Sequence, residues 1–281
     1  MAFHMEAFRS SLSSGVTDVF QQVTYITAGA LLAPSGSGLQ VSAQLNKLFS
    51  IHGVGAHLEL IQPQAASFQP LPYPTFGPNN VGTANESPPR FWDFSAAPKV
   101  MRPTEFLNIF ASQTSAGAEN EAVFVQFTDG QNPVAPPVAQ APGLNGNGSY
   151  TVVHGTATTT LTANAWSQVT PVLDTPLPAG NYALVGARVV SATALAFRMH
   201  PVNEPLWRPG SSACQAADGL DAPNARYINP LNGAMSKWGV WLTFFQNVFP
   251  FVDIWATAAD TKEDFFFDLI KLSDTTSMGA L

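Results

Sequence analysis

The feature that most constrains this chain is a segment that occurs twice. Phe106–Asp129, FLNIFASQTSAGAENEAVFVQFTD, aligns without a gap with Phe251–Asp274, FVDIWATAADTKEDFFFDLIKLSD, 145 positions further along. Four aligned positions are identical, and most others pair apolar with apolar or polar with polar. Because the period is about half of the 281 residues, the repeat predicts two copies of one β-rich unit in tandem.

Alternating apolar and polar residues predict strands throughout both halves. Each copy of the repeat would form the closing pair of strands of its unit. Two weaker similarities precede it in the same order: LIQP (60–63) with RMHP (198–201), and RFWDF (90–94) with KWGVW (237–241). The other predicted strands are Val23–Ala28, Leu39–Leu45, Phe49–Val54, His57–Ile61, Thr151–Leu161, Trp166–Leu173, Ala183–Val190 and Ala194–Met199.

Proline-rich stretches mark long loops, because proline cannot donate a hydrogen bond to a sheet. Pro63–Pro89 contains seven prolines, and Pro201–Asn232 holds the corresponding place in the second half. Residues 131–150, with four Pro, three Gly and no charge, predict a connector. The predicted parts are an N-terminal arm or short helix (1–22), a first jelly roll (23–130), the linker (131–150), a second jelly roll (151–275) and a flexible tail (276–281).

The N-terminal prediction rests on apolar residues spaced by three and four, including Phe8, Leu12 and Val16. Such a segment could be a terminal helix packing on its own domain. It could also be an arm that reaches a neighbouring subunit.

Charge is scarce in this chain. Only 11% of residues are charged, against about 25% in an average soluble domain, while 46% are hydrophobic and 20 are Phe. This composition indicates a surface largely covered by other subunits, or alternatively a secreted Ala/Ser/Thr-rich β protein. The net charge of −7 and the lack of clustered Lys and Arg argue against direct binding of nucleic acid. Cys214 is the single cysteine, which excludes an intramolecular disulfide and a thiolate zinc site.

No catalytic, cofactor-binding or metal-binding motif is present, so we predict a protein that is not an enzyme and has no cofactor. His52 and His57 would point to opposite faces of an extended strand, and each of the five histidines is interpreted as satisfied or partly buried. The acidic pairs Glu119/Glu121 and Glu263/Asp264 are expected in solvent-exposed turns between the closing strands.

With its duplicated FLNIFASQ…FVQFTD and FVDIWATA…LIKLSD blocks and the QNPVAPPVAQAPGLNGNGS joint, the chain resembles the double jelly-roll major capsid proteins of tailless icosahedral viruses, particularly bacteriophages with an internal membrane. The resemblance spans Val23–Leu272 and implies an all-β chain of two tandem jelly rolls that assembles as trimeric, pseudo-hexagonal capsomers. It also implies a virion protein made in the host cytoplasm, with itself, other virion proteins and an internal membrane as partners. The candidate contacts between subunits are Phe8, Leu12, Phe68, Tyr73, Phe76, Trp207, Arg208 and Tyr227.

A different class of protein remains open as an alternative. A β-sandwich receptor- or carbohydrate-binding spike or adhesin would present exposed aromatic rings to its ligand, with Trp92, Trp207 and Tyr227 as candidates. A glycoside-active enzyme would require paired carboxylates facing one cleft.

Overall fold

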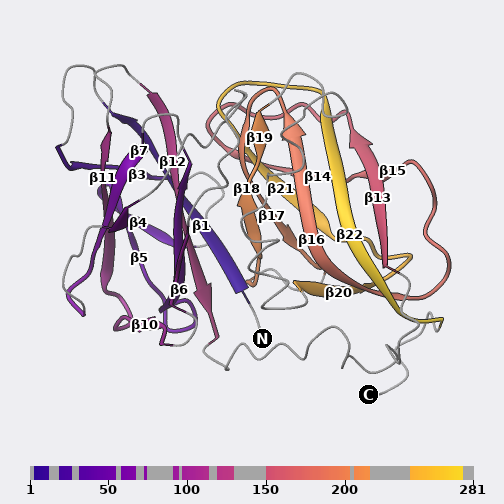
Figure 1. The fold of residues 1–281 in the computed structure, drawn as a ribbon, viewed down its shortest axis with the longest axis horizontal. Helices are drawn as coiled ribbons and strands as arrows, with labels where there is room; N and C mark the ends of the chain where they lie inside the picture. The colour runs from indigo at the N-terminus through magenta and orange to yellow at the C-terminus, as the bar shows by residue number, and fades with distance from the viewer. Residues whose placement is uncertain are drawn as a thin grey trace. The chain divides into compact units, whose positions relative to one another are not determined.

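The computed structural model describes residues 3–12, 19–26, 32–54, 58–67, 73–74, 91–94, 97–113, 119–129, 150–202, 206–215 and 241–274. Regular structure in these residues is entirely β, as Figure 1 shows. The described residues divide into two compact units, one of residues 3–129 and one of residues 150–274 apart from Asn164–Trp166. Within the described ranges, no helix is long and apolar enough to cross a membrane.

Short strands build both units. Those of the first unit are β1 (Phe3–Leu12), β2 (Gln21–Gln22), β3 (Thr24–Tyr25), β4 (Ala33–Ser35), β5 (Gly38–Gln40), β6 (Lys47–Val54), β7 (Leu58–Gln64), β8 (Tyr73–Pro74), β9 (Phe91–Asp93), β10 (Lys99–Val100), β11 (Phe106–Gln113) and β12 (Glu119–Thr128). Those of the second unit are β13 (Tyr150–Ala157), β14 (Trp166–Val169), β15 (Val172–Leu173), β16 (Asn181–Ser191), β17 (Ala194–His200), β18 (Gly210–Ser212), β19 (Cys214–Gln215), β20 (Leu242–Phe245), β21 (Phe251–Ala256) and β22 (Glu263–Ser273).

In the first unit the strands form two sheets with jelly-roll order. One sheet runs β10-β6-β12-β1-β3, with β9 also on β6; the other runs β4-β5-β11-β7-β8, with β2 also on β11. The first and last long strands, β1 and β12, are therefore neighbours in one sheet, while β11 is central in the other. Chain segments that alternate between two antiparallel sheets in this way define a jelly roll.

The second unit repeats this order. Strand β22 lies between β13 and β16, as β12 lies between β1 and β6, and β21 pairs with β17 as β11 pairs with β7. Figure 1 shows β13, β22 and β16 side by side. The two copies of the sequence repeat thus occupy the same topological position, which confirms the predicted all-β class and two tandem jelly rolls.

One detail of the predicted repeat is wrong. The two closing strands were expected to form a pair, yet β11 and β12 lie in different sheets, as do β21 and β22. Each of these strands pairs instead with strands far away in sequence, because a jelly roll alternates consecutive strands between its sheets. The proline similarity is also out of register, since Pro63 lies inside β7 opposite Ile109, whereas Pro201 follows the end of β17.

The helix predicted within residues 1–22 is wrong. Phe3–Leu12 is strand β1, antiparallel to β12 along its whole length. Both faces of β1 are buried, with Met5 and Phe8 fully enclosed. A short apolar segment fits either helical or strand periodicity, and here the pairing with β12 decides. The predicted connector, except for Tyr150, and the predicted tail at 276–281 lie outside the described residues.

Alternation along the strands builds the core of each unit. In β11 the odd positions Leu107, Ile109 and Ala111 are fully buried, while Phe106 is 46% exposed. In β22, Phe265 and Phe267 take the inward positions, and the Phe267 ring packs edge-on against Phe249 with 4.9 Å between centroids. The Phe106–Ala111 part of β11 therefore has a buried inner face and a partly exposed outer face.

Candidate functional site

Both predicted long loops leave the β-sheets at segments that a carboxylate holds in place. In the first unit this group is Glu105, whose side chain accepts hydrogen bonds from the backbone N–H and the hydroxyl of Ser67 and from the backbone N–H of Arg102, the last at 2.8 Å. Ser67 is the last described residue before Phe68. Glu105 therefore ties the start of the Pro63–Pro89 segment to the turn between β10 and β11.

The hydrogen bonds to Glu105 also set its charge. Burial would raise the pKa of this carboxyl group, but the bonds from Ser67 and Arg102 and the nearby guanidinium outweigh burial and lower it. The carboxylate form is thus the one that the loop stem stabilises.

The neighbouring Thr104 has a backbone conformation that is unusual for a β-branched residue, with φ at 71°. Two contacts hold it: the Thr104 N–H donates to the Val41 carbonyl at 2.9 Å, and Gln40 Nε2 donates to the Thr104 carbonyl at 3.1 Å. Strain of this kind persists only where the surroundings fix the turn from several sides. The Arg102–Glu105 turn is therefore rigidly held.

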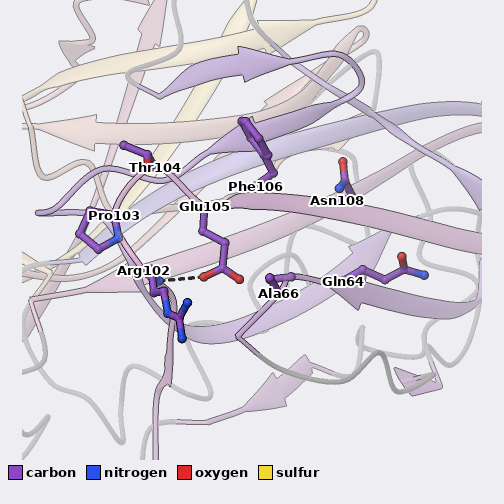
Figure 2. Close-up of a pocket in the computed structure, with 9 residues that line it drawn as sticks. Gln64, Ala66, Arg102, Pro103, Thr104, Glu105, Phe106 and Asn108 are labelled. Atoms are coloured by element: carbon purple, nitrogen blue, oxygen red, sulfur yellow. Dashed lines mark hydrogen bonds between the residues drawn. The ribbon is translucent and has the colours of Figure 1, made fainter.

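This turn forms one wall of an open cleft of about 600 Å³. The opposite wall is the end of β7, with Gln64, Ala65 and Ala66. Figure 2 shows Phe106 and Asn108 rising from the same side of β11, opposite to Glu105. The cleft thus combines a half-exposed aromatic ring with amide side chains.

In the second unit Asp253 holds the corresponding segment. Arg198 Nε donates to Asp253 Oδ2 at 3.1 Å, Arg208 Nη1 donates to the same oxygen at 2.5 Å, and His200 Nε2 lies 3.6 Å from Oδ1. Arg198 is fully buried. Arg208 and Pro209 lie immediately before β18, so this ion cluster connects the segment returning from Pro201 to strands β17 and β21.

The ion cluster keeps the Asp253 side chain deprotonated. Burial would raise the pKa of Asp253, but His200, Arg198 and Arg208 together lower it to about 2. A buried carboxylate with two guanidinium partners is a structural clamp, and removing one partner would leave an uncompensated charge.

A second acidic group lies in the turn between β21 and β22. Asp260 accepts hydrogen bonds from the Ser191 hydroxyl at 2.8 Å and from the Ala192 N–H at 3.1 Å. Glu263 and Asp264 were predicted to be solvent-exposed, and this is wrong: they are 0% and 4% exposed. The turn folds back so that β22 already begins within the sheet at Glu263, paired with Ala157.

Glu263 is chemically the most unusual of these residues. Neither carboxyl oxygen has a hydrogen-bond partner within the described part of the chain. Burial, followed by the charges of Asp260 and Asp264, raises the pKa of Glu263 to about 8. The side chain is therefore a neutral acid at neutral pH.

His154 joins this acidic turn to the strand β15. Its Nδ1 lies 2.5 Å from Asp174 Oδ2 and its Nε2 lies 3.3 Å from Asp264 Oδ1, while the ring packs on Phe266 at 4.9 Å. Each ring nitrogen therefore lies next to a carboxylate, and His154 connects β13 with Asp174 after β15 and with Asp264 in β22. Across the described ranges, no group of three or more His, Cys, Asp or Glu residues is arranged to hold a metal ion.

The predicted subunit contacts fall into three groups. Phe8 is fully buried, with its ring 5.4 Å from that of Tyr25, so it offers no surface to another subunit. Trp207 and Arg208 are partly buried beside the Asp253 clamp. Leu12 lies in β1 and Tyr73 lies in β8. Phe68, Phe76 and Tyr227 lie outside the described residues.

Sequence reasoning did not predict the partners of either clamp carboxylate. Asp253 was aligned with Asn108 in the repeat, and Arg102–Pro103 and Arg208–Pro209–Gly210 predict turns in which a buried arginine fixes the loop, as Arg208 does through its bond to Asp253. The pattern carried no signal that would join Glu105 to Ser67 across the unit.

No family model matches this chain, and no curated protein matches it. The solved structures that are similar to it include two capsid proteins. The crystal structure of the major capsid protein P2 from Bacteriophage PM2 aligns with a TM-score of 0.23 and 11% identity, covering 94% of this chain and 97% of that protein. The crystal structure of the STIV MCP aligns with a TM-score of 0.25 and 10% identity, covering 98% of this chain and all of that one.

Proposed function

We propose that this chain is a structural virion protein, a major capsid protein that self-assembles as trimeric, pseudo-hexagonal capsomers into an icosahedral shell. The observation that carries the proposal is the occurrence of the same jelly-roll strand order twice in one chain. A ring of six similar barrels needs only three chains of this kind. Closed rotational symmetry then lets the same surface contact serve every neighbouring pair of chains.

The two clamped loop stems support this function. Contact loops make specific interfaces when rigid elements present them, and Glu105 and Asp253 hold the stems on the sheets of their units. We therefore place the subunit contacts on the Pro63–Pro89 and Pro201–Asn232 segments, with Trp207 and Arg208 at the described base of the second. The low charge of the chain, 11% of residues, suits surfaces that become buried between copies.

The remaining partners follow from the same proposal. Such a protein would be made in the host cytoplasm, would occur in the virion and would contact other virion proteins. With a net charge of −7 it is suited to a shell that lies over an internal membrane rather than directly on the genome.

Light scattering coupled to size-exclusion chromatography tests the proposal. The expected mass is three times the 29.9 kDa of one chain, or a larger multiple, at working concentration. A stable monomer at every concentration would refute it. Trp207→Ala should lower the trimeric fraction, whereas Val172→Ala, at a 70% exposed position of β15 in the same unit, should not.

A further inference from the structure

The outer face of the β2-β11-β7 sheet has an unusual composition. Three consecutive outward positions of β11 and the residues opposite two of them are amides or aromatic rings, and none of these is charged. We call this set the amide face; it consists of Gln22, Gln62, Gln64, Phe106, Asn108 and Phe110.

The strand register places these residues in rows across the sheet. Phe110 of β11 lies opposite Gln22 of β2 on one side and Gln62 of β7 on the other. Asn108 lies opposite Gln64, one row along. Directly opposite residues point to the same face, so a phenyl ring is flanked by carboxamides on both sides.

Hydrogen bonds within the face orient the amides. Gln22 Nε2 donates to Asn108 Oδ1 at 2.9 Å, and Gln64 Nε2 donates to Gln62 Oε1 at 3.1 Å. Each of these pairs uses one donor and one acceptor of its amides, so further donors and acceptors face solvent. Gly38 makes room for this arrangement, because a Cβ atom there would lie 2.2 Å from Asn108 Oδ1.

The amide face continues into the cleft described above. Gln64, Phe106 and Asn108 belong to both, and the rigid Arg102–Glu105 turn closes the cleft on one side. The Phe106 ring, 46% exposed, projects from β11 among the residues that line the cleft (Figure 2). From Phe106 to Phe110 the strand rises by about 13 Å, at about 3.3 Å per residue, which is longer than one pyranose ring.

We propose that the amide face and its cleft bind a neutral carbohydrate chain. A pyranose ring presents an apolar C–H face that stacks on an aromatic ring and hydroxyl groups that both donate and accept hydrogen bonds, which carboxamides match. A protein partner would be favoured by the two Phe rings but not by the four carboxamides, because the residues enriched at protein interfaces are Tyr, Trp, Phe, Met and Arg. The amide-face residues carry no charge, and in the adjoining cleft the opposite charges of Arg102 and Glu105 offset each other, which favours uncharged sugars.

In the second unit, three positions that correspond to the amide face are buried instead of partly exposed. By strand register, Asp253 and Arg198 occupy the places of Asn108 and Gln64. These two residues form a buried ion pair there, and Trp255, which corresponds to Phe110, is only 2% exposed. Only the first copy therefore presents an open amide face, distinct from Trp92, Trp207 and Tyr227.

Isothermal titration calorimetry of the full-length protein tests this proposal. The neutral ligands are maltohexaose, cellohexaose, chitohexaose and mannohexaose, and hexagalacturonate is the acidic control. We expect at least one neutral hexasaccharide to bind. Phe106→Ala and Asn108→Ala should each weaken binding by about tenfold, while Phe106→Tyr should retain it. Phe251→Ala, at the corresponding position of the second unit, is the matched control and should bind like the wild type.

Three results would overturn the proposal: no binding of any neutral hexasaccharide, binding of hexagalacturonate alone, or binding that Phe106→Ala and Asn108→Ala leave unchanged. If Phe106→Ala alters the melting temperature, Phe106→Leu replaces it, because leucine fills the site but offers no ring face. Loss of the trimer in Phe106→Ala, seen by light scattering, would make the face a subunit interface and also overturn it. A monomeric wild type that binds sugar would refute the capsid proposal alone.

Discussion

Asn108 and Asp253 occupy the same position in the two jelly rolls. Each lies on the strand that precedes the last one, directly opposite Gln64 in the first unit and Arg198 in the second. The first pair consists of partly exposed amides, whereas the second is a buried ion pair with an Nε to Oδ2 distance of 3.1 Å. One strand arrangement thus supports an open surface in one copy and a closed clamp in the other.

Replacing Asp253 with Asn should destabilise the second unit strongly. Arg198 and Arg208 would lose their shared carboxylate, and breaking a buried pair costs about 3 to 5 kcal/mol. Guanidinium unfolding of the variant measures this loss. Asn108→Ala is the matched control in the first unit and should cost less than about 1 kcal/mol.

The Asp253 clamp also predicts an acid response. Because its pKa is lowered from 3.8 to about 2, the stability that it contributes is present above pH 3.8 and is lost as pH falls toward 2. The melting temperatures of the wild type and of Asp253→Asn should therefore approach each other as the pH falls from 3.8 to about 2. A difference in melting temperature that stays constant over this pH range would contradict the ion pairing of Asp253.

Glu263→Gln should stabilise the protein at alkaline pH. The pKa of Glu263 is raised from 4.5 to about 8, so the folded state binds this proton more tightly than the unfolded chain does. Its contribution to stability is full below pH 4.5 and is lost as pH rises through 8. The variant should melt higher than wild type at pH 8, with a flatter dependence of melting temperature on pH between 4.5 and 8. An unchanged pH profile would show that Glu263 is not buried as an acid.

Glu105→Ala should release the first loop stem. The amides of Ser67 and Arg102 donate to this carboxylate, and both should exchange with deuterium faster in the variant. The Val41 amide donates instead to the backbone carbonyl of Glu105 at 2.9 Å, so its exchange should stay unchanged and serves as an internal control. Equal protection of Ser67 and Arg102 in both proteins would contradict the clamp.

Thr104→Gly should stabilise the first unit. Relief of the left-handed conformation at φ 71° is worth about 1 to 2 kcal/mol, partly offset by the greater freedom of glycine in the unfolded chain. Chemical unfolding should therefore show a net gain of up to about 1 kcal/mol. Thr24→Gly, at an exposed strand position of the same unit, is the control and should lower stability. A loss of stability at Thr104 would mean that this turn is not strained.

The sequence was sufficient to find the duplicated strands because the inner positions of β11, β12, β21 and β22 must stay apolar. The largest mismatch in the alignment, Asn120–Ala122 against Phe265–Phe267, departs from this rule, because Phe265 and Phe267 are core residues of the second unit and the first unit has Asn120 and Ala122 at these positions. Periodicity therefore located the strands but could not show that consecutive ones lie in different sheets.

The features that could not be predicted depend on contacts between residues that lie far apart in the sequence. Strand β1 resembled a helix because its partner β12 lies more than a hundred residues away, and local spacing carries no trace of that pairing. For the same reason the contacts of Glu105 with Ser67 and of Asp253 with Arg208 could not be predicted. The amide face emerges only when β2, β7 and β11 are placed in register.

Electron microscopy of the purified, assembled protein tests the central claim most directly. Class averages should show a pseudo-hexagonal particle of six barrels contributed by three chains, each chain supplying two barrels of matching strand order. Isolated particles with only two barrels, under all conditions of concentration and salt, would contradict the account.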